Sequence, residues 1–196
     1  MVIDTLVPKE SQDNLKDRTF VSDELILLEP DRYWLIQQGI VKFSAWTEEG
    51  MAIVLGYWGV GDLIGQPLSL VYPYQVQCIT SVRASYIPVS QSHQIISSIQ
   101  RQVRQTEELL WIQRTETIYP RLRKILLWMA GKFGREVEIG RVIKLRLTHQ
   151  DLAELVGATR VTITKTINQL EREGFLSRPK RNTIIVHEIE PNVLSK

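Results

Sequence analysis

The segment from Thr148 to Gly174, "THQDLAELVGATRVTITKTINQLEREG", constrains the fold of this chain more than any other stretch. It opens with Thr-x-x-Asp, the pattern of a capping box, in which Thr148 and Asp151 satisfy free N–H groups at a helix start. Two short amphipathic patterns then flank Gly157, which can adopt a positive φ without the steric penalty of a Cβ atom. The segment therefore predicts two short helices joined by a glycine turn.

The second predicted helix begins after Thr159, its expected cap, and has an apolar and a polar face. The buried face follows the spacing i, i+4, i+7 at Ile163, Ile167 and Leu170. The opposite face, near the amino-terminal end, carries Arg160, Val161, Thr162, Thr164 and Lys165. This arrangement predicts a helix-turn-helix, whose second helix enters the major groove of DNA. The alternative is an amphipathic helix pair used only for packing.

The polar face suits contacts with base pairs and phosphates. Arg160 can donate two hydrogen bonds to guanine O6 and N7, and Val161 can offer apolar contact to a thymine methyl group. Lys165 can reach a base or a phosphate. Polar side chains suited to phosphate contacts are predicted at Thr148, Gln150, Thr162 and Thr164.

After the second helix, "GFLSRPKRNTIIVHEI" predicts a β-hairpin with Arg178, Lys180 and Arg181 at its tip. A basic tip beside a recognition helix is a winged arrangement, whose charges add salt-dependent, sequence-independent affinity for DNA. A solvated loop is the alternative for this tip alone. Residues 119–196 hold 15 Lys and Arg against 8 Asp and Glu, whereas residues 1–118 hold 9 against 14. This asymmetry suggests that the carboxyl-terminal part meets a polyanion.

Between about Glu24 and Val89 the chain consists of short apolar runs, rich in β-branched and aromatic residues, between turn-like segments. Many short strands at close spacing predict a sandwich, roll or barrel. "ELILL" is the first of these predicted strands, and "TEEG" predicts a hairpin turn.

From Ser90 the pattern becomes helical, and a helix is expected from about Arg101 to Tyr119. Its apolar residues are Val103, Leu109, Leu110, Ile112 and Ile118. A second copy of this helix is the simplest partner for such a stripe, and packing on the chain's own β domain is the alternative.

Pro120 predicts the end of that helix and the start of another, because proline fits best in a first helical turn. Gly131 or Gly134 should end this second helix. The alternating stretch "REVEIGRVIKLRL" then predicts a small hairpin that turns at Gly140.

Composition argues against several classes of protein. No apolar run approaches membrane-spanning length and the first residues lack a secretory pattern, so a cytoplasmic protein is expected. The single cysteine, Cys78, cannot form an intrachain disulfide. The three histidines, His93, His149 and His187, lack metal-ligand spacing. We therefore predict neither a metal nor a cofactor.

The segment "LTHQDLAELVGATRVTITKTINQLEREG" closely resembles the helix-turn-helix signature of the CRP/FNR family of bacterial transcription regulators. The predicted organisation is also similar to that family: a β-roll containing "GDLIG", a dimerisation helix, a hinge and a winged helix-turn-helix. The resemblance covers about residues 24–190. It implies a homodimer that binds a two-fold symmetric operator in double-stranded DNA, with RNA polymerase as a further partner.

Within the resemblance, Arg160 matches the guanine-reading arginine of the family and Lys165 the basic reader one turn later. The positions that match phosphate contacts are Thr148, Gln150, Thr159 and Thr162. Val161 departs from the branch that carries an acidic reader there. "TRVTIT" instead resembles the cyanobacterial nitrogen-control branch, which implies a half-site containing G-T.

The amino-terminal half departs from the relatives that bind cyclic AMP, which carry Gly-Glu followed later by Arg-Ser. Gln66 stands where the glutamate is expected, and Tyr74 and Gln75 stand near the Arg-Ser position. Without the arginine, a phosphodiester would lose a strong bidentate contact, so binding of cyclic AMP by this cassette is not expected. The multi-cysteine iron–sulfur set of another branch is excluded by the single Cys78. The effector stays unassigned.

We therefore expect an α+β chain in three parts: residues 1–90, a sensor-like β-roll; residues 91–119, a dimerisation helix and hinge; and residues 120–196, a winged helix-turn-helix. The predicted function is that of a homodimeric, sequence-specific transcription regulator, not an enzyme and not a membrane protein. One alternative is a small β-barrel enzyme with an accessory DNA-binding domain, although metal chemistry of the cupin type needs clustered histidines, and residues 24–89 contain none. Another is an architectural protein whose β-roll contacts RNA polymerase.

Overall fold

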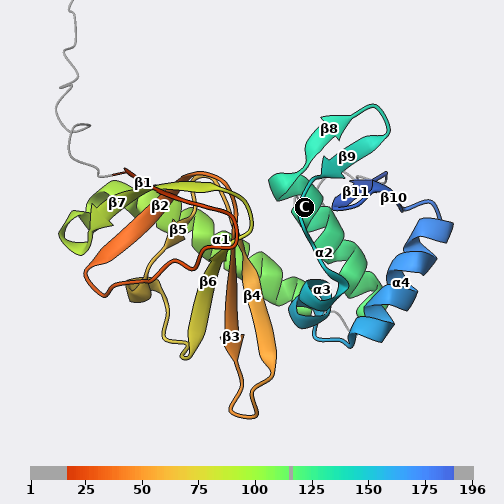
Figure 1. Ribbon diagram of the computed structural model, residues 1–196, viewed down its shortest axis with the longest axis horizontal. Helices are drawn as coiled ribbons and strands as arrows, with labels where there is room; N and C mark the ends of the chain where they lie inside the picture. Colours follow the sequence, from red (N-terminus) through yellow and green to blue (C-terminus); the bar gives the residue numbers. More distant parts are fainter. Residues whose placement is uncertain (1–16, 115–116, 188–196) are drawn as a thin grey trace, which may run out of the picture.

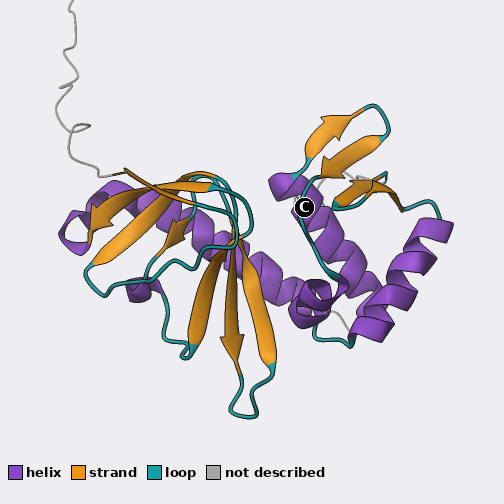
Figure 2. Ribbon diagram, in the orientation of Figure 1, coloured by secondary structure: helices purple, strands orange, loops and turns teal. Residues whose placement is uncertain are grey.

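The computed structural model describes residues 17–114 and 117–187 and has an α+β architecture (Figure 1, Figure 2). Its amino-terminal half contains two antiparallel sheets, with strand orders β1-β7-β2-β5 and β4-β3-β6. The strands are β1 (Asp17–Phe20), β2 (Arg32–Gln38), β3 (Val41–Trp46), β4 (Ala52–Trp58), β5 (Leu63–Ile64), β6 (Tyr74–Cys78) and β7 (Val82–Pro88). The expected β-rich first half is thus confirmed.

The two sheets bury their facing sides because each strand carries apolar residues toward the other layer. The shared core contains Phe20, Trp34, Ile36, Val41, Phe43, Val76, Val82 and Ala84. The predicted "TEEG" turn joins β3 to β4, with the Gly50 N–H donating to Thr47 O at 2.9 Å. A short 3-10 helix, η1 (Gln66–Leu68), follows β5.

The prediction of a strand at "ELILL" is wrong in part. Leu25 forms only an isolated bridge with Gln77, and Leu27 is exposed. The segment runs beside β6 through single bonds, such as Ile26 N–H to Val76 O at 2.9 Å. Asp23, which precedes the segment, has a φ of 67°, a conformation outside the β region. Pro30, which follows the segment, has no N–H to donate, so neither residue can continue a regular ladder of hydrogen bonds between strands.

The long helix ends earlier than expected. After the 3-10 segment η2 (Val89–Ile95), α1 spans Ile96–Gln113, and α2 spans Ile118–Phe133. The break therefore precedes Pro120, which lies in the first turn of α2. Proline fits there because the first N–H groups of a helix have no partner within the helix. Gly134 ends α2, as one of the two expected glycines, and its N–H donates to Ala130 O.

The apolar residues of α1 form two sets instead of the single expected stripe. Leu109 and Ile112 are only 5% and 3% exposed, because they pack inside this chain. Ile96, Val103 and Leu110 are 54%, 53% and 58% exposed. The exposed set recurs every seven residues, so it lies along one side of the helix.

The carboxyl-terminal half contains the predicted helix-turn-helix and both predicted hairpins. Its elements are β8 (Arg135–Val137), β9 (Gly140–Ile143), α3 (His149–Val156), α4 (Arg160–Arg172), β10 (Leu176–Lys180) and β11 (Thr183–Val186). The four strands form one sheet in the order β10-β11-β9-β8. In Figure 1 the sheet lies above α2, α3 lies at the lower end of α2, and α4 runs beside α2 on the right.

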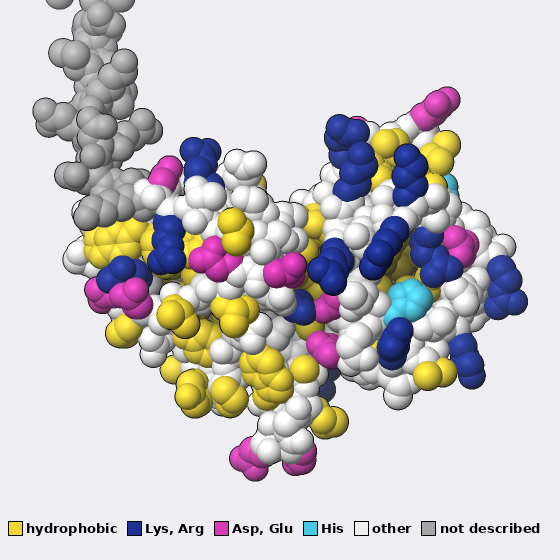
Figure 3. Space-filling view, viewed as in Figure 1, with side chains coloured by type: hydrophobic (Ala, Val, Ile, Leu, Met, Phe, Trp, Pro, Cys, Tyr) yellow, Lys and Arg dark blue, Asp and Glu magenta, His cyan; other side chains and the backbone are white. Residues whose placement is uncertain are grey.

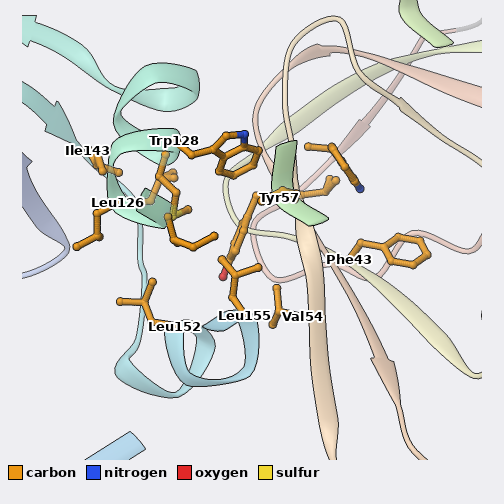
Figure 4. Close-up of a cluster of buried hydrophobic side chains, with 14 of the residues drawn as sticks. Phe43, Val54, Tyr57, Leu126, Trp128, Ile143, Leu152 and Leu155 are labelled. Atoms are coloured by element: carbon orange, nitrogen blue, oxygen red, sulfur yellow. The ribbon is translucent and has the colours of Figure 1, made fainter. Parts of the chain in front are cut away.

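The two halves share one apolar core (Figure 4). Val54 and Tyr57 of β4 point toward Leu126 of α2 and toward Leu152 and Leu155 of α3. Two ion pairs flank this contact: Lys42 Nζ lies 2.6 Å from Asp151 Oδ1, and Lys132 Nζ lies 2.7 Å from Asp62 Oδ2. All four side chains are at least largely buried, so the helix-turn-helix is firmly held against the β-roll. Among the described residues, no helix is both long and apolar enough to cross a membrane.

Candidate nucleic-acid interface

The start of α3 forms the capping box that the sequence predicts. Thr148 Oγ1 accepts a hydrogen bond from Asp151 N–H at 3.0 Å, and Asp151 Oδ2 accepts one from Thr148 N–H at 3.0 Å. Burial opposes ionisation of Asp151, but hydrogen bonds from Lys42 and Thr148 outweigh it and hold the pKa of this carboxyl below its ordinary value. The same aspartate therefore caps α3 and ties it to β3.

The turn between α3 and α4 also follows the prediction. Gly157 has φ 72° and ψ 48°, the left-handed conformation in which glycine carries no Cβ penalty. Thr159 then caps α4, because its Oγ1 accepts a hydrogen bond from Thr162 N–H at 3.1 Å. These local bonds fix the direction in which α4 leaves the turn.

One face of α4 packs on the domain and the other is open. The predicted inward residues Ile163, Ile167 and Leu170 are buried, together with Thr166. On the open face lie Arg160, Lys165 and Val161, whose side chain is 64% exposed. Within the described part of the chain, the Arg160 guanidinium has no hydrogen bond or ion pair with another side chain. The predicted base-reading residues therefore share one accessible surface.

The predicted phosphate-contacting hydroxyls are partly engaged within the domain. Thr162 Oγ1 lies 2.8 Å from Thr159 Oγ1. Thr164 Oγ1 donates to Arg160 O at 2.9 Å and lies 2.8 Å from His149 Nδ1. Gln150 is exposed on α3 and donates to Glu154 Oε1 at 2.9 Å. Thr148 and Thr164 are the two whose hydroxyl hydrogens are already used, because Thr148 Oγ1 donates to Asp151 Oδ2 at 2.6 Å and Thr164 Oγ1 donates to Arg160 O.

The wing is the hairpin β10–β11, and its three predicted cations do not share one role. Arg178 is bonded to Glu171 of α4, and its Nη2 donates to Asn168 Oδ1 at 2.8 Å. These bonds brace the wing against the recognition helix, and the hydrogen bond from Arg178 lowers the pKa of Glu171. Lys180 and Arg181 are exposed at the turn, where Asn182 has a positive φ. They are the cations that a ligand can reach.

Between α3 and the wing lies a cavity of about 450 Å³. Its polar lining includes His149, Glu171, Arg178, Lys180, Arg181 and Asn182. Figure 3 shows Lys and Arg side chains gathered over this half of the molecule, with histidine among them. The sequence did not predict the contact between His149 and Thr164, because that contact joins two helices and leaves no local pattern.

In the amino-terminal half, the positions that correspond to the cyclic AMP cassette, Gln66, Tyr74 and Gln75, carry uncharged side chains. Gln66 is exposed at the start of η1, and the Tyr74 ring stacks on Phe43 with centroids 5.3 Å apart. Cys78 is fully buried, and burial raises its pKa to about 11, as for a small core residue. Within residues 17–114 and 117–187, no group of three or more His, Cys, Asp or Glu side chains could hold a metal ion.

Comparisons with known proteins agree with this geometry. Residues 120–190 match the family model of the Crp-like helix-turn-helix domain. The chain is 42% identical over 157 residues to the "Regulatory protein CysR" of Synechococcus elongatus, an alignment that covers 78% of this chain and 75% of the relative. It is 28% identical over 174 residues to the "Global nitrogen regulator" of Synechocystis sp., covering 80% of this chain and 76% of that protein.

A solved structure matches nearly the whole fold. The crystal structure of a transcriptional regulator of the CRP/FNR family from Thermus thermophilus superposes with a TM-score of 0.72 and 25% identity. The match covers 89% of this chain and 94% of that one. The winged helix-turn-helix, the β-roll and these similarities together place the chain in the CRP/FNR family of transcription regulators.

Proposed function

We propose that this regulator acts as a homodimer that lays two copies of α4 into successive major grooves of a two-fold symmetric operator. The observation that carries the proposal is the open face of α4. Arg160, Val161 and Lys165 are all exposed there, in the first two turns after the Thr159 cap. Docking of a recognition helix by its amino-terminal residues brings such a face to the base edges. The exposed Lys180 and Arg181 of the wing add contacts to the phosphate backbone.

The half-site contains a G-T step in this proposal. The unpaired guanidinium of Arg160 reads guanine through two hydrogen bonds, and the exposed Val161 side chain packs on the thymine methyl group. Contacts from Gln150, Thr159 and Thr162 to phosphates set the register of the helix. Thr148, which was predicted to join them, instead uses its hydroxyl hydrogen on Asp151 Oδ2 in the cap of α3. Thr164 contributes by holding Arg160 and His149 instead of by a direct contact to DNA.

The exposed stripe of α1 supports the dimer. Ile96, Val103 and Leu110 are more than half exposed and recur every seven residues, the spacing of a two-helix seam. Ile53 and Leu55 of β4 line the same groove as Leu110. A second copy of α1 would cover this whole apolar surface, whereas within one chain Leu109 and Ile112 are already buried and this surface is left open.

We also propose that residues 1–90, 91–119 and 120–196 act as sensor-like domain, dimerisation segment and DNA-binding domain. The change from strands to helices after Pro88 supports the first boundary, and the helix-turn-helix match from residue 120 supports the second. The sensor-like domain does not bind cyclic AMP through the usual cassette, since Gln66 and Tyr74 replace the charged groups. RNA polymerase is the further partner of the DNA-bound dimer, and run-off transcription with and without the protein tests that contact.

The experiment is a binding-site selection with the purified protein, followed by genomic footprinting with and without nucleotides and keto-acids. The proposal predicts an inverted repeat whose half-sites contain G-T and are centred about 10 base pairs apart. Enrichment of unrelated sequences, or of single half-sites alone, would reject it. Footprints that strengthen only with cyclic AMP would reject the statement about the cassette.

A further inference from the structure

His149 lies where the first turn of α3, the recognition helix and the wing come together. It is the first residue of α3, half-buried, and its Nδ1 is 2.8 Å from Thr164 Oγ1 of α4. Its ring also lines the 450 Å³ cavity beside Arg178, Lys180 and Arg181 of the wing. The histidine therefore touches the recognition helix with one ring nitrogen and borders a cavity with a mixed lining, which includes the three wing cations and aliphatic residues such as Leu145 and Leu147.

The bond to Thr164 fixes the tautomer of the neutral ring. The Thr164 hydroxyl has one hydrogen, which it donates to Arg160 O at 2.9 Å. It must therefore accept from His149, so the proton of the neutral imidazole sits on Nδ1. Nε2 is left as an unprotonated acceptor, and no other described group bonds to it.

This tautomer determines whether the ring can donate a hydrogen bond to an anion. A phosphate oxygen only accepts hydrogen bonds, and a bare Nε2 has none to donate. Addition of a proton creates an N–H at Nε2 and leaves the bond from Nδ1 to Thr164 unchanged. The ring can therefore switch from a poor to a good phosphate ligand without any rearrangement of α3 or α4.

The charges around His149 oppose protonation while the cavity holds no anion. Arg160 and Glu171 face it from α4, Arg178 and Lys180 from β10, and Arg181 from the wing turn. Glu171 is already paired with Arg178, and on α3 itself Asp151 is held by Lys42 and Thr148. Burial, followed by the positive charges of Arg178 and Arg160, lowers the pKa of His149. A phosphate in the cavity would add a negative charge and act in the opposite direction.

We propose that a backbone phosphate of bound DNA enters the cavity between α3 and the wing, and that His149 takes up a proton to contact it through Nε2. The inference rests on the proposed DNA-binding face. It adds that each subunit binds one proton together with DNA, so the affinity for the operator increases as the pH falls.

The test measures the dissociation constant of the selected operator between about pH 5.5 and 8.5 at constant salt, within the range in which histidine titrates. For each subunit, the dissociation constant should fall by up to about tenfold for each unit by which the pH is lowered. This change is confined to the range between the pKa of His149 in the free protein and its pKa in the complex with DNA. His149→Asn places an amide donor near the position of Nδ1, keeps the bond to Thr164, and removes the titration. This variant should bind with a flat pH profile over the same range.

Two controls separate His149 from the other histidines. His187 uses both ring nitrogens, with Nδ1 2.9 Å from Ile139 O and Nε2 2.9 Å from Ser177 Oγ, and His93 lies on η2 of the β-roll. His93→Gln should keep the full pH dependence. Since the chain has three histidines, their ring signals can also be followed by NMR in the native protein, which does not depend on the folding of any variant.

The pKa of His149 should rise when the operator is added. Parallel pH profiles of the native protein and His149→Asn, or an unchanged or lowered pKa of His149 on the DNA, would overturn the inference and leave the proposed function standing. Absence of sequence-specific binding at every pH would overturn both.

Discussion

At the scale of single residues, the recognition helix separates side chains that hold the motif from side chains left for DNA. The sequence predicted the caps, the turn glycine and the buried face correctly, because each depends on neighbours within a few positions. It did not predict that Thr164 is committed to His149 and Arg160, or that Arg178 braces Glu171. Those contacts join different elements, so no local spacing reveals them.

Arg160 carries the first residue-scale prediction. Arg160→Ala should cost about 1–3 kcal/mol of discrimination at the guanine of the half-site, because it removes a bidentate contact to one base. Competition binding with operators substituted at each position measures this loss. Arg181→Ala is the matched control: it removes a wing charge and should weaken binding to all sequences alike, with a shallower salt dependence. Equal loss at every base in Arg160→Ala would contradict the assigned role.

Two glycines carry opposite predictions for stability. Gly157→Ala should destabilise the fold by about 1–2 kcal/mol, since an L-residue at φ 72° is strained although its Cβ would meet no atom closer than 3.7 Å. Gly131 lies inside α2, where an added Cβ meets nothing within 4 Å. Gly131→Ala should therefore stabilise the fold by about 0.5–1 kcal/mol through helix propensity. Urea unfolding measures the change in stability of each variant. Changes in the same direction for both variants would contradict this explanation.

At the scale of elements, long periodic segments were predicted well and their ends less well. The two hairpins and the helix pair have the expected places, but α1 ends at Gln113 and not at Tyr119. Pro120 marks the region of the break, yet it is equally compatible with the end of one helix and the first turn of the next. Likewise, the periodicity placed Leu109 and Leu110 in one apolar group. In the fold Leu109 is buried and Leu110 is exposed, a difference that depends on tertiary packing.

The contact between β3 and α3 predicts a pH-dependent contribution to stability. The folded pKa of Asp151 is depressed, so its contribution is complete above the ordinary pKa of 3.8 and is lost as the pH falls through the folded value. Lys42→Met removes the ion pair and should cost about 2 kcal/mol at neutral pH. The variant should then lose less stability than the parent between about pH 5 and pH 2.

Urea unfolding at several pH values measures both effects. Lys144→Met, which removes an exposed lysine from the same half of the molecule as α3, should change stability by less than about 0.5 kcal/mol at any of these pH values. An acid-induced loss as steep in Lys42→Met as in the parent would show that Asp151 does not depend on Lys42.

At the scale of the whole molecule, the β-roll and the winged domain share one continuous apolar core. The sequence predicted three parts but could not predict the contact between the first and the last, because Lys132 and Asp62 are distant in the chain and each looks like an ordinary surface charge. In the fold, Asp62 is 1% exposed, and it also accepts a hydrogen bond from Gly59 N–H at 2.7 Å.

Loss of one partner of this buried pair should be costly. Lys132→Met leaves the Asp62 carboxylate buried without its cation and should destabilise the protein by about 3–5 kcal/mol. Addition of Asp62→Asn removes the uncompensated charge and keeps an acceptor for Gly59 N–H, so the double variant should recover much of the loss. Calorimetric unfolding measures the three proteins, and a double variant less stable than Lys132→Met would contradict the argument.

The central claim is that two subunits, paired along α1, place two recognition helices on one operator. Sedimentation equilibrium of the protein with the selected operator, at about 150 mM salt, tests it most directly. We predict a complex of two chains per duplex, with a scrambled duplex bound about a thousandfold or more weakly. One chain per duplex, or equal binding to the scrambled sequence, would contradict the claim.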